Sequence, residues 1–260
     1  MSVIRTTGHD GWIHVELSSP ANRNALGTQF VEALIATAEH LHREMPRAVL
    51  VTAEGPTFTV GGDLKLFAGL SAEELPATMD WMVSGYHGAL LRWLELPMPV
   101  VAAVHGAVAG GGLGLLGVAD TVLAAEGTVF ASGFAALGLS GDGLWSWFLP
   151  RMIGQRRTVE FVFEQRNLEA AEAADWGLVT RVVPGADLLA EGTRVVQRYA
   201  AGPSGSLARM KDLLVGPTRE ALRQQAARET AAMHDTVRSP DAVTGIRAFV
   251  AKQQPRFQGS

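Results

Sequence analysis

The stretch PVVAAVHGAVAGGG, residues 99–112, decides the fold class of this chain. Residues 99–104 form a continuous apolar run of the kind found in strands that are buried on both faces. Four glycines follow within residues 106–112, just before a segment that we expect to be helical. A buried strand that leads through a glycine-rich turn into a helix is typical of α/β proteins.

The segments on either side of this stretch repeat the same alternation. Apolar runs at residues 48–52 and 121–124 predict two further buried strands. Helical periodicity covers residues 28–44, with Thr28 as a candidate cap, and residues 71–96. At the start of the chain, residues 3–7 and 12–17 predict a hairpin. We therefore predict an α/β fold with mostly parallel strands.

The C-terminal part of the chain changes character. From about residue 186, helical patterns continue to about residue 252, broken at Gly202-Pro203 and Gly216-Pro217. We place a boundary near residue 200, which divides an α/β core, residues 1–200, from a helical region, residues 201–260.

Composition limits the functional classes that remain. The chain has 260 residues, of which 47% are hydrophobic, and a formal net charge of -4. It contains no cysteine, which excludes disulfides, thiolate catalysis and zinc–thiolate sites. No Lys/Arg run indicates a nucleic-acid partner, and no apolar run reaches the 18 residues of a membrane span. The first residues have no signal-peptide pattern, so we expect a soluble cytoplasmic protein.

Two glycine turns have the properties of an oxyanion-binding site. Gly61-Gly62 and Gly110-Gly111-Gly112 each follow a buried strand and precede a helix. Glycine allows a ligand to approach the backbone, and a helix N-terminus offers unpaired N–H donors. Two such donors that converge on a carbonyl oxygen would stabilise an oxyanion. Glycines at such turns also serve packing alone, and the phosphate-binding motif G-x-x-x-x-G-K-[ST] is absent.

Six ordered motifs resemble those of the crotonase (enoyl-CoA hydratase/isomerase) superfamily. They cover nearly the whole chain: NRNAL (22–26), FTVGGDLK (58–65), PVVAAVHGAVAGGG (99–112), residues 138–151 from GL to LPR, residues 170–183 with ADWGLV (174–179), and AFVAK to PRF (248–257). The resemblance implies a core of repeated β-β-α turns and a C-terminal helical region that supports homotrimers, often paired into hexamers. It implies an acyl-CoA thioester as substrate, with no metal and no cofactor beyond the coenzyme A of that substrate.

The resemblance also assigns roles to individual residues. Gly62 and Gly111 would supply the two oxyanion-hole N–H groups. The backbone and side chains of five residues would hold the adenine and the pantetheine arm of coenzyme A: Arg23, Ala25, Val60, Asp63 and Leu64. Phe249 and Lys252 match tail positions that reach a CoA site, often that of a neighbouring subunit. Lys252 would pair with a CoA phosphate, although a solvated lysine at a helix end is an equal alternative. Asp63 is, in the same way, also a candidate helix cap.

Departures from the family pattern indicate the type of reaction. Hydratases of this superfamily use two glutamates, and the matching positions here are Gly114 and Phe134. This chain therefore lacks both acid/base carboxylates, which argues against an ordinary hydratase. Asp142 matches the catalytic aspartate of dienoyl-CoA isomerases, epoxyphenylacetyl-CoA-type isomerases and 4-chlorobenzoyl-CoA dehalogenases. We predict an acyl-CoA isomerase with Asp142 as acid/base, whose pKa an apolar pocket would raise. The alternative role of Asp142 is the N-cap of the helix that follows.

Other candidate residues leave alternatives open. His87 matches a catalytic histidine of the dehalogenases, and it is otherwise a pocket wall or a core residue. Phe134 and Trp145, with Trp147 nearby, are expected to line the pocket and favour an aryl or branched acyl group. The alternative functions are a non-catalytic acyl-CoA binder and an aryl-CoA dehalogenase or hydrolase.

Overall fold

The computed structural model describes residues 2–71 and 73–259. Its strands are β1 (Ile4–Gly8), β2 (Trp12–Leu17), β3 (Ala48–Ala53), β4 (Val100–Val104), β5 (Ala107–Ala109), β6 (Thr121–Ala125), β7 (Val129–Ala131), β8 (Asn167–Glu169) and β9 (Arg181–Val183). Its α-helices are α1 (Thr28–Glu44), α2 (Leu64–Gly69), α3 (Glu74–Leu94), α4 (Leu113–Gly117), α5 (Trp145–Met152), α6 (Gln155–Phe163), α7 (Ala170–Trp176), α8 (Leu188–Ala201), α9 (Ser204–Val215), α10 (Arg219–Val237) and α11 (Pro240–Val250). Short 3-10 turns include η2 (Gly110–Gly112) and η3 (Ala135–Leu137).

The strands form two sheets. The larger has the order β1-β2-β3-β4-β6-β9, and the smaller has the order β5-β7-β8. In the larger sheet β1 pairs antiparallel with β2, and every other pair is parallel, in register with Trp12 opposite Ala48 and Val101 opposite Thr121. The prediction of a hairpin followed by mostly parallel strands is confirmed.

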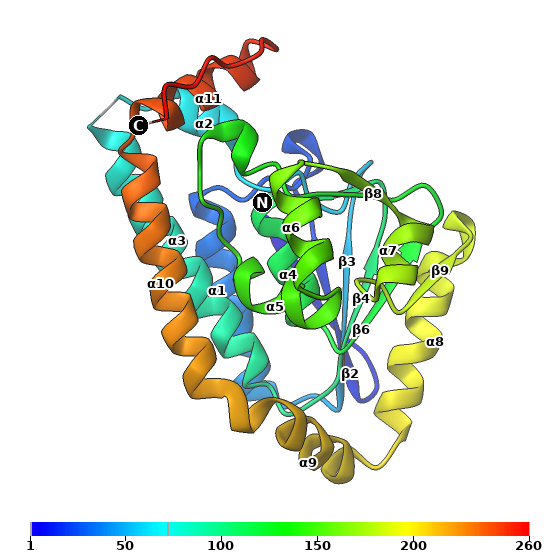
Figure 1. Cartoon of the computed structure of the whole chain (residues 1–260). Coiled ribbons are helices and arrows are strands. Elements are labelled where there is room, and N and C mark those ends of the chain that lie inside the picture. The colour runs from blue at the N-terminus through cyan, green and yellow to red at the C-terminus, as the bar shows by residue number, and fades with distance from the viewer. Residues whose placement is uncertain (1, 72, 260) are drawn as a thin grey trace.

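Helices cover both faces of the larger sheet (Figure 1). On one face, Leu50, Val101 and Leu123 pack against Val195 and its neighbours in α8. The alternate residues of the same strands belong to the main core with α1, α3 and α10. Because both faces are buried, the strands are apolar throughout, which is why they appear in the sequence as continuous runs.

Successive turns of the chain share one construction. Each contributes a strand to the larger sheet and then a shorter segment to the smaller one, as β4 and β5 do, and then β6 and β7. The turn that starts with β3 contributes only Thr59, which bridges Val108 of β5. A glycine-containing turn follows each short segment, at residues 61–62, 110–112 and 133. Neighbouring turns of the spiral therefore bring these three loops to one edge of the molecule.

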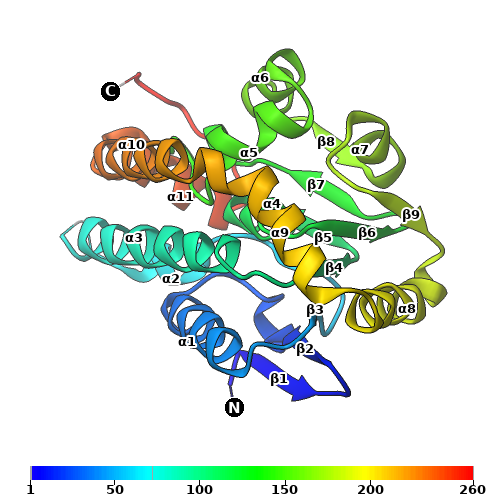
Figure 2. The same cartoon turned by 90° about the horizontal axis from the view of Figure 1, so that it is seen from below.

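The C-terminal helices pack onto this spiral (Figure 2). Helix α10 lies along α3 and contacts α5, and α11 contacts α2 and η3. The buried positions of α10 are Leu222, Ala226, Glu229, Met233 and Val237, of which only Glu229 is charged. The helical pattern predicted after residue 186 is confirmed, and the helices break at both glycine–proline pairs.

Several elements differ from the sequence-based expectation. Thr28 is the first residue of α1 rather than its cap, and the N-cap position is Gly27. Strands β5, β7 and β8 were not predicted, because each has only three residues, of which only the middle one is buried. No helix in the described part of the chain is long and apolar enough to cross a membrane.

Candidate active site

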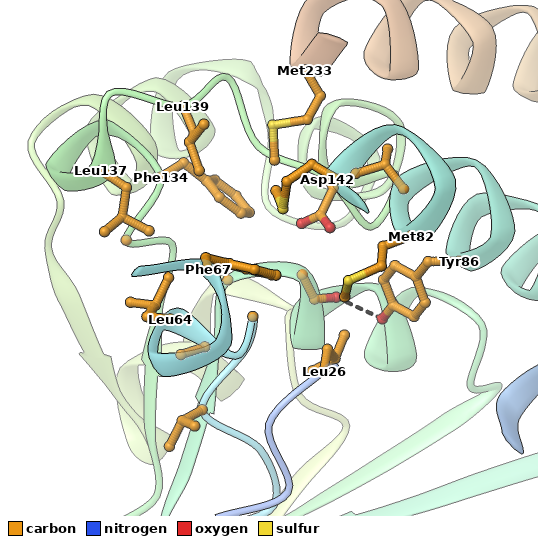
Figure 3. Close-up of a pocket in the computed structure, with 18 of the residues that line it drawn as sticks. Leu26, Leu64, Phe67, Met82, Tyr86, Phe134, Leu137, Leu139, Asp142 and Met233 are labelled. Atoms are coloured by element: carbon orange, nitrogen blue, oxygen red, sulfur yellow. Dashed lines mark hydrogen bonds between the residues drawn. The ribbon is translucent and has the colours of Figure 1, made fainter. Parts of the chain in front are cut away.

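The three glycine-containing loops, α3 and α10 surround a cavity of about 220 Å³ (Figure 3). Its walls are mostly apolar, with Met82, Leu139 and Met233 among them. Gly62, Gly111 and Asp142 lie in the same lining. The cavity therefore brings together the three residues assigned to catalysis from the sequence.

The first two glycine loops pack against each other backbone to backbone. A Cβ atom on Gly61 would lie 2.7 Å from the carbonyl oxygen of Ala109, and one on Gly110 would lie 3.7 Å from the Cα of Gly61. Gly61 also has a φ of +79°, which favours glycine. This close approach requires the absence of side chains and sets the peptides of Gly62 and Gly111 side by side.

The backbone N–H groups of Gly62 and Gly111 are the hydrogen-bond donors that the two packed loops leave without partners. No acceptor in residues 2–71 and 73–259 bonds the N–H of Gly62. The N–H of Gly111 lies in the first turn of η2, where a helix leaves its donors without internal partners. Two unpaired N–H groups at an apolar cavity are what the binding of an oxyanion would require.

A buried tyrosine fixes the peptide of Gly111. Tyr86 of α3 donates from its hydroxyl to the carbonyl oxygen of Gly111 at 2.7 Å (Figure 3). Burial, followed by the nearby carboxylates of Asp142 and Glu229, raises the pKa of Tyr86 well above its ordinary value. The phenol therefore stays protonated and keeps donating at physiological pH.

Asp142 is a half-buried residue whose carboxyl group is directed at the glycine turn. A Cβ on Gly111 would lie 2.6 Å from Oδ1 of Asp142. Burial raises the pKa of Asp142 from 3.8 to about 6; the nearby His87 lowers it and Glu229 raises it further. A carboxyl group with a pKa near neutrality can both take up and release a proton.

The N-cap interpretation of Asp142 is not supported by the geometry. The N-cap position of α5 is Leu144, whose side chain makes no capping bond. Instead, Glu229 of α10 accepts the N–H of Leu144 at 2.6 Å and the N–H of Ser146 at 3.2 Å. The carboxyl group of Asp142 is therefore left free to face the cavity.

This burial predicts how stability depends on pH. Because the folded state raises the pKa of Asp142, ionisation of Asp142 destabilises the fold as the pH rises from about 4 to about 6. Above that window the penalty is complete, at about 3 kcal/mol. We expect Asp142→Asn to unfold at higher urea concentration than the wild type at pH 8, with the difference shrinking below pH 5. A stability difference that does not vary with pH would contradict this assignment.

The residues assigned to CoA binding are divided between the cavity and its surroundings. Val60, Leu64, Phe134 and Phe249 line the cavity. Asp63 instead caps α2, since its carboxylate accepts the N–H of Leu66 at 3.1 Å.

The other assigned residues lie outside the lining. Arg23 is exposed, and its backbone has a left-handed conformation. Ala25 is buried and precedes Leu26, which does line the cavity. Lys252 is exposed just beyond α11. Trp145 donates from its indole N–H to Ser140 at 3.1 Å, and its ring centroid lies 6.2 Å from that of Phe134.

His87 lies behind the cavity rather than in its wall. Its ring is buried, with Nδ1 2.8 Å from the hydroxyl of Thr230, and Nε2 accepts the N–H of Gly143 at 3.1 Å. His87 therefore contacts the loop that carries Asp142.

Neither position of the family glutamates carries a carboxylate, and position 114 has no room for a side chain. A Cβ on Gly114 would lie 2.5 Å from the carbonyl oxygen of Gly143 and 2.8 Å from Leu90. Phe134 is buried, and its ring packs where a Cβ on Gly141 would lie, at 2.6 Å. Asp142 is thus the only carboxylate in the cavity lining of the residues described.

Sequence reasoning missed Tyr86, Glu229 and the cavity methionines. Glu229 left a signal, because it is the one charged residue in the apolar stripe of α10. Tyr86 left none, since a tyrosine among apolar helix positions is common in cores. No cluster of three potential metal-ligating His, Cys, Asp or Glu side chains occurs within the described ranges.

Comparison with known proteins identifies the family of this chain. The family model described as enoyl-CoA hydratase/isomerase matches residues 7–260. A probable enoyl-CoA hydratase of Rhodobacter capsulatus is 32% identical, over 98% of each chain. The 1,2-epoxyphenylacetyl-CoA isomerase of Escherichia coli is 28% identical, over 100% of this chain and 99% of its own.

Two further relatives extend the range of chemistries and the structural match. The 4-chlorobenzoyl coenzyme A dehalogenase-2 of an Arthrobacter species is 27% identical, over 94% of this chain and 89% of its own. The crystal structure of an enoyl-CoA hydratase from Mycobacterium avium subsp. paratuberculosis superposes with a TM-score of 0.88 at 28% identity, over 98% of each chain. The fold is thus that of the crotonase-type enzymes, and the chain belongs to the enoyl-CoA hydratase/isomerase family, which acts on acyl-CoA thioesters.

Proposed function

We propose that this protein is an acyl-CoA isomerase that moves a proton along the acyl chain through a thioester enolate. The N–H groups of Gly62 and Gly111 bind the enolate oxygen, and Asp142 removes a proton from one carbon and returns it to another. The observation that carries the proposal is the carboxyl group of Asp142 beside Gly111, the one carboxylate in the cavity lining of the described residues, whose pKa is raised to about 6.

The electrostatics of the cavity suit this reaction. Negative charge develops on the thioester oxygen as the α-proton leaves, and two fixed N–H donors in an apolar site stabilise that charge without reorganisation. A base whose pKa lies near the working pH balances proton affinity against the fraction ionised. Isomerisation needs one such group, because the same carboxyl group can accept the proton and return it.

Hydration is less well supported. Adding water to a double bond needs a group that holds and activates the water, and the two family positions for that task carry Gly114 and Phe134. The cavity lining around Asp142 is otherwise mostly apolar and includes Leu139 and Met233. These surroundings favour proton transfer within the bound acyl group over attack by water.

A second candidate is dehalogenation of an aryl-CoA, favoured by the Arthrobacter relative and by the carboxylate of Asp142 in the cavity lining. Here Asp142 would attack the ring carbon and release halide, and water would then hydrolyse the ester. In H₂¹⁸O, a single turnover would leave ¹⁸O in the carboxyl group of Asp142. Isomerisation leaves that carboxyl group unlabelled. A non-catalytic binder would give neither product nor label.

The substrate and assembly are part of the same proposal. The small apolar cavity and the ring of Phe134 favour an aryl or branched acyl group, with Val60, Leu64 and Phe249 at the pantetheine side. We infer a homotrimer or a dimer of trimers from the family resemblance, and the exposed apolar surface that Met210, Leu213 and Leu214 of α9 form supports association with another subunit. Lys252 and Arg23 are then available to the phosphates of coenzyme A.

Deuterium exchange tests the reaction class without knowledge of the natural acyl group. We expect the enzyme to exchange the α-protons of phenylacetyl-CoA in D₂O, followed by mass spectrometry. The rate should fall about tenfold per pH unit well below pH 6 and level off above it, because only ionised Asp142 accepts a proton. Absence of exchange with this thioester and with a panel of enoyl- and epoxyacyl-CoAs would overturn the proposal.

A further inference from the structure

The loop that carries Asp142 makes few backbone hydrogen bonds of its own. It connects η3 to α5, and Gly138, Gly141, Gly143 and Leu144 all have left-handed φ values between +61° and +90°. Leu144 is the costly member, since a side chain at positive φ is unfavourable. Something outside the loop must hold this conformation.

Side chains from α3 and α10 supply the missing partners. The N–H of Ser140 bonds the hydroxyl of Thr236, that of Gly143 bonds His87, and that of Leu144 bonds Glu229. These contacts bracket Asp142 on both sides. The backbone around Asp142 is therefore held by two helices distant in sequence.

Glu229 is the centre of this arrangement. Its side chain is only 3% exposed, and it accepts the N–H groups of Leu144 and Ser146 and the hydroxyl of Ser146. A buried carboxylate is tolerated only when its oxygens are well bonded. Glu229 meets this requirement through Leu144 and Ser146, which lie shortly after Asp142 in the chain. The position of Glu229 and that of this segment therefore depend on each other.

His87 joins Glu229 to the loop. Its Nε2 lies 3.1 Å from the N of Gly143 and 3.2 Å from Oε1 of Glu229, and its Nδ1 faces the hydroxyl of Thr230. The ring thus stands between α10 and the peptide that follows Asp142. It contacts the loop backbone and not the acyl cavity, whose lining includes Tyr86 but not His87.

Other charged groups lie on the far side of this pair. Arg223, His234 and Asp235 line an open groove between α3 and α10, and His234 approaches Asp80 at 3.5 Å. Towards the cavity, the ionisable neighbours are Asp142 and Tyr86. Glu229 and His87 are therefore the two ionisable residues of α10 and α3 that stand between this groove and the loop of Asp142.

We propose that Glu229 and His87 are positioning residues, which hold the peptides of Gly143 and Leu144 so that the carboxyl group of Asp142 stays directed at the acyl cavity. This inference rests on the proposed role of Asp142 as the acid/base. Neither residue touches the acyl group, so their effect is on the placement and ionisation of Asp142. The charge of Glu229 raises the pKa of Asp142, and His87 lowers it.

The test uses α-proton exchange of phenylacetyl-CoA together with ¹³C NMR of labelled aspartate carboxyl groups. We expect Glu229→Gln to lower kcat about 10- to 100-fold, with KM changed less than about threefold, since misplaced groups lose rate rather than binding. The pKa of Asp142 should fall in Glu229→Gln and rise in His87→Gln. A purely structural role would not shift this pKa in opposite directions.

Two further variants keep the test decisive. Glu220→Gln changes an exposed glutamate on the same helix, whose side chain is 73% exposed, and should leave kcat and the pKa of Asp142 unchanged. Ser146→Ala removes one hydrogen-bond donor to Glu229 but leaves the carboxylate bonded to two N–H groups, so it should lower kcat less than Glu229→Gln does. This variant carries the test if Glu229→Gln folds poorly. Unchanged kcat and unchanged Asp142 titration in Glu229→Gln and Ser146→Ala would overturn the inference.

Failure of the proposed function would give a different result. If Asp142→Asn exchanged protons at the wild-type rate, Asp142 would not be the acid/base. The opposite pKa shifts measured by NMR would then still show that Glu229 and His87 control the carboxyl group. If Asp142→Asn lost exchange while Glu229→Gln kept it in full, only the positioning role would be refuted.

Discussion

Asp142→Asn is expected to lose about 10²- to 10⁴-fold in proton-transfer rate, the range that a general acid/base contributes. Asparagine keeps the size of the side chain, so the cavity beside Gly111 stays filled, but it cannot accept a proton. The two N–H donors still polarise the thioester, so some exchange above the uncatalysed rate should remain. The measurement is kcat for α-proton exchange of phenylacetyl-CoA in D₂O.

A control variant separates the chemistry from general effects on the fold. Asp80→Asn changes a carboxylate of α3 that pairs with Arg238 at the protein surface. This variant should keep the wild-type exchange rate, and its stability should also change little, because a surface ion pair contributes little to stability. An Asp142→Asn enzyme within about threefold of wild-type kcat would refute the acid/base role.

The large elements of the fold were predictable because burial on both faces leaves a simple pattern. Strands β3, β4 and β6 are apolar at almost every position, and helices α1 and α10 begin and end near glycine or proline. The small sheet was not predictable. Its strands have three residues each, too few for a periodicity to emerge, and their pairing depends on contacts between successive turns of the chain.

The candidate site was predictable in part, from the resemblance rather than from spacing. Local sequence indicated two glycine turns but could not show that Gly61 packs against Ala109. Asp142 remained ambiguous because Asp-Gly before a helix is a typical capping pattern. The ambiguity ends with Glu229, which lies 87 residues further along the chain and takes the N–H groups that Asp142 would have capped. A contact of that range leaves no trace in the local pattern.

Gly111→Pro is expected to reduce kcat at least as strongly as the loss of one oxyanion donor, about 10²- to 10³-fold. Proline removes the N–H that faces the cavity. It also adds carbon atoms where a Cβ would lie 2.6 Å from Oδ1 of Asp142, so the carboxyl group must move as well. Binding of the thioester ground state depends less on this donor, so KM should change less than kcat.

Comparison with Gly111→Ala separates these two effects. Alanine adds the same Cβ beside Asp142 but keeps the N–H, so the ratio of kcat between the alanine and proline variants isolates the donor. Gly88→Ala serves as the control, because a Cβ on this exposed glycine of α3 would meet no atom within 4 Å. We expect proline to be at least tenfold slower than alanine, and Gly88→Ala to match the wild type. Equal rates for the proline and alanine variants would mean that the N–H of Gly111 does not bind the enolate, because the only loss shared by both variants would be the displacement of Asp142.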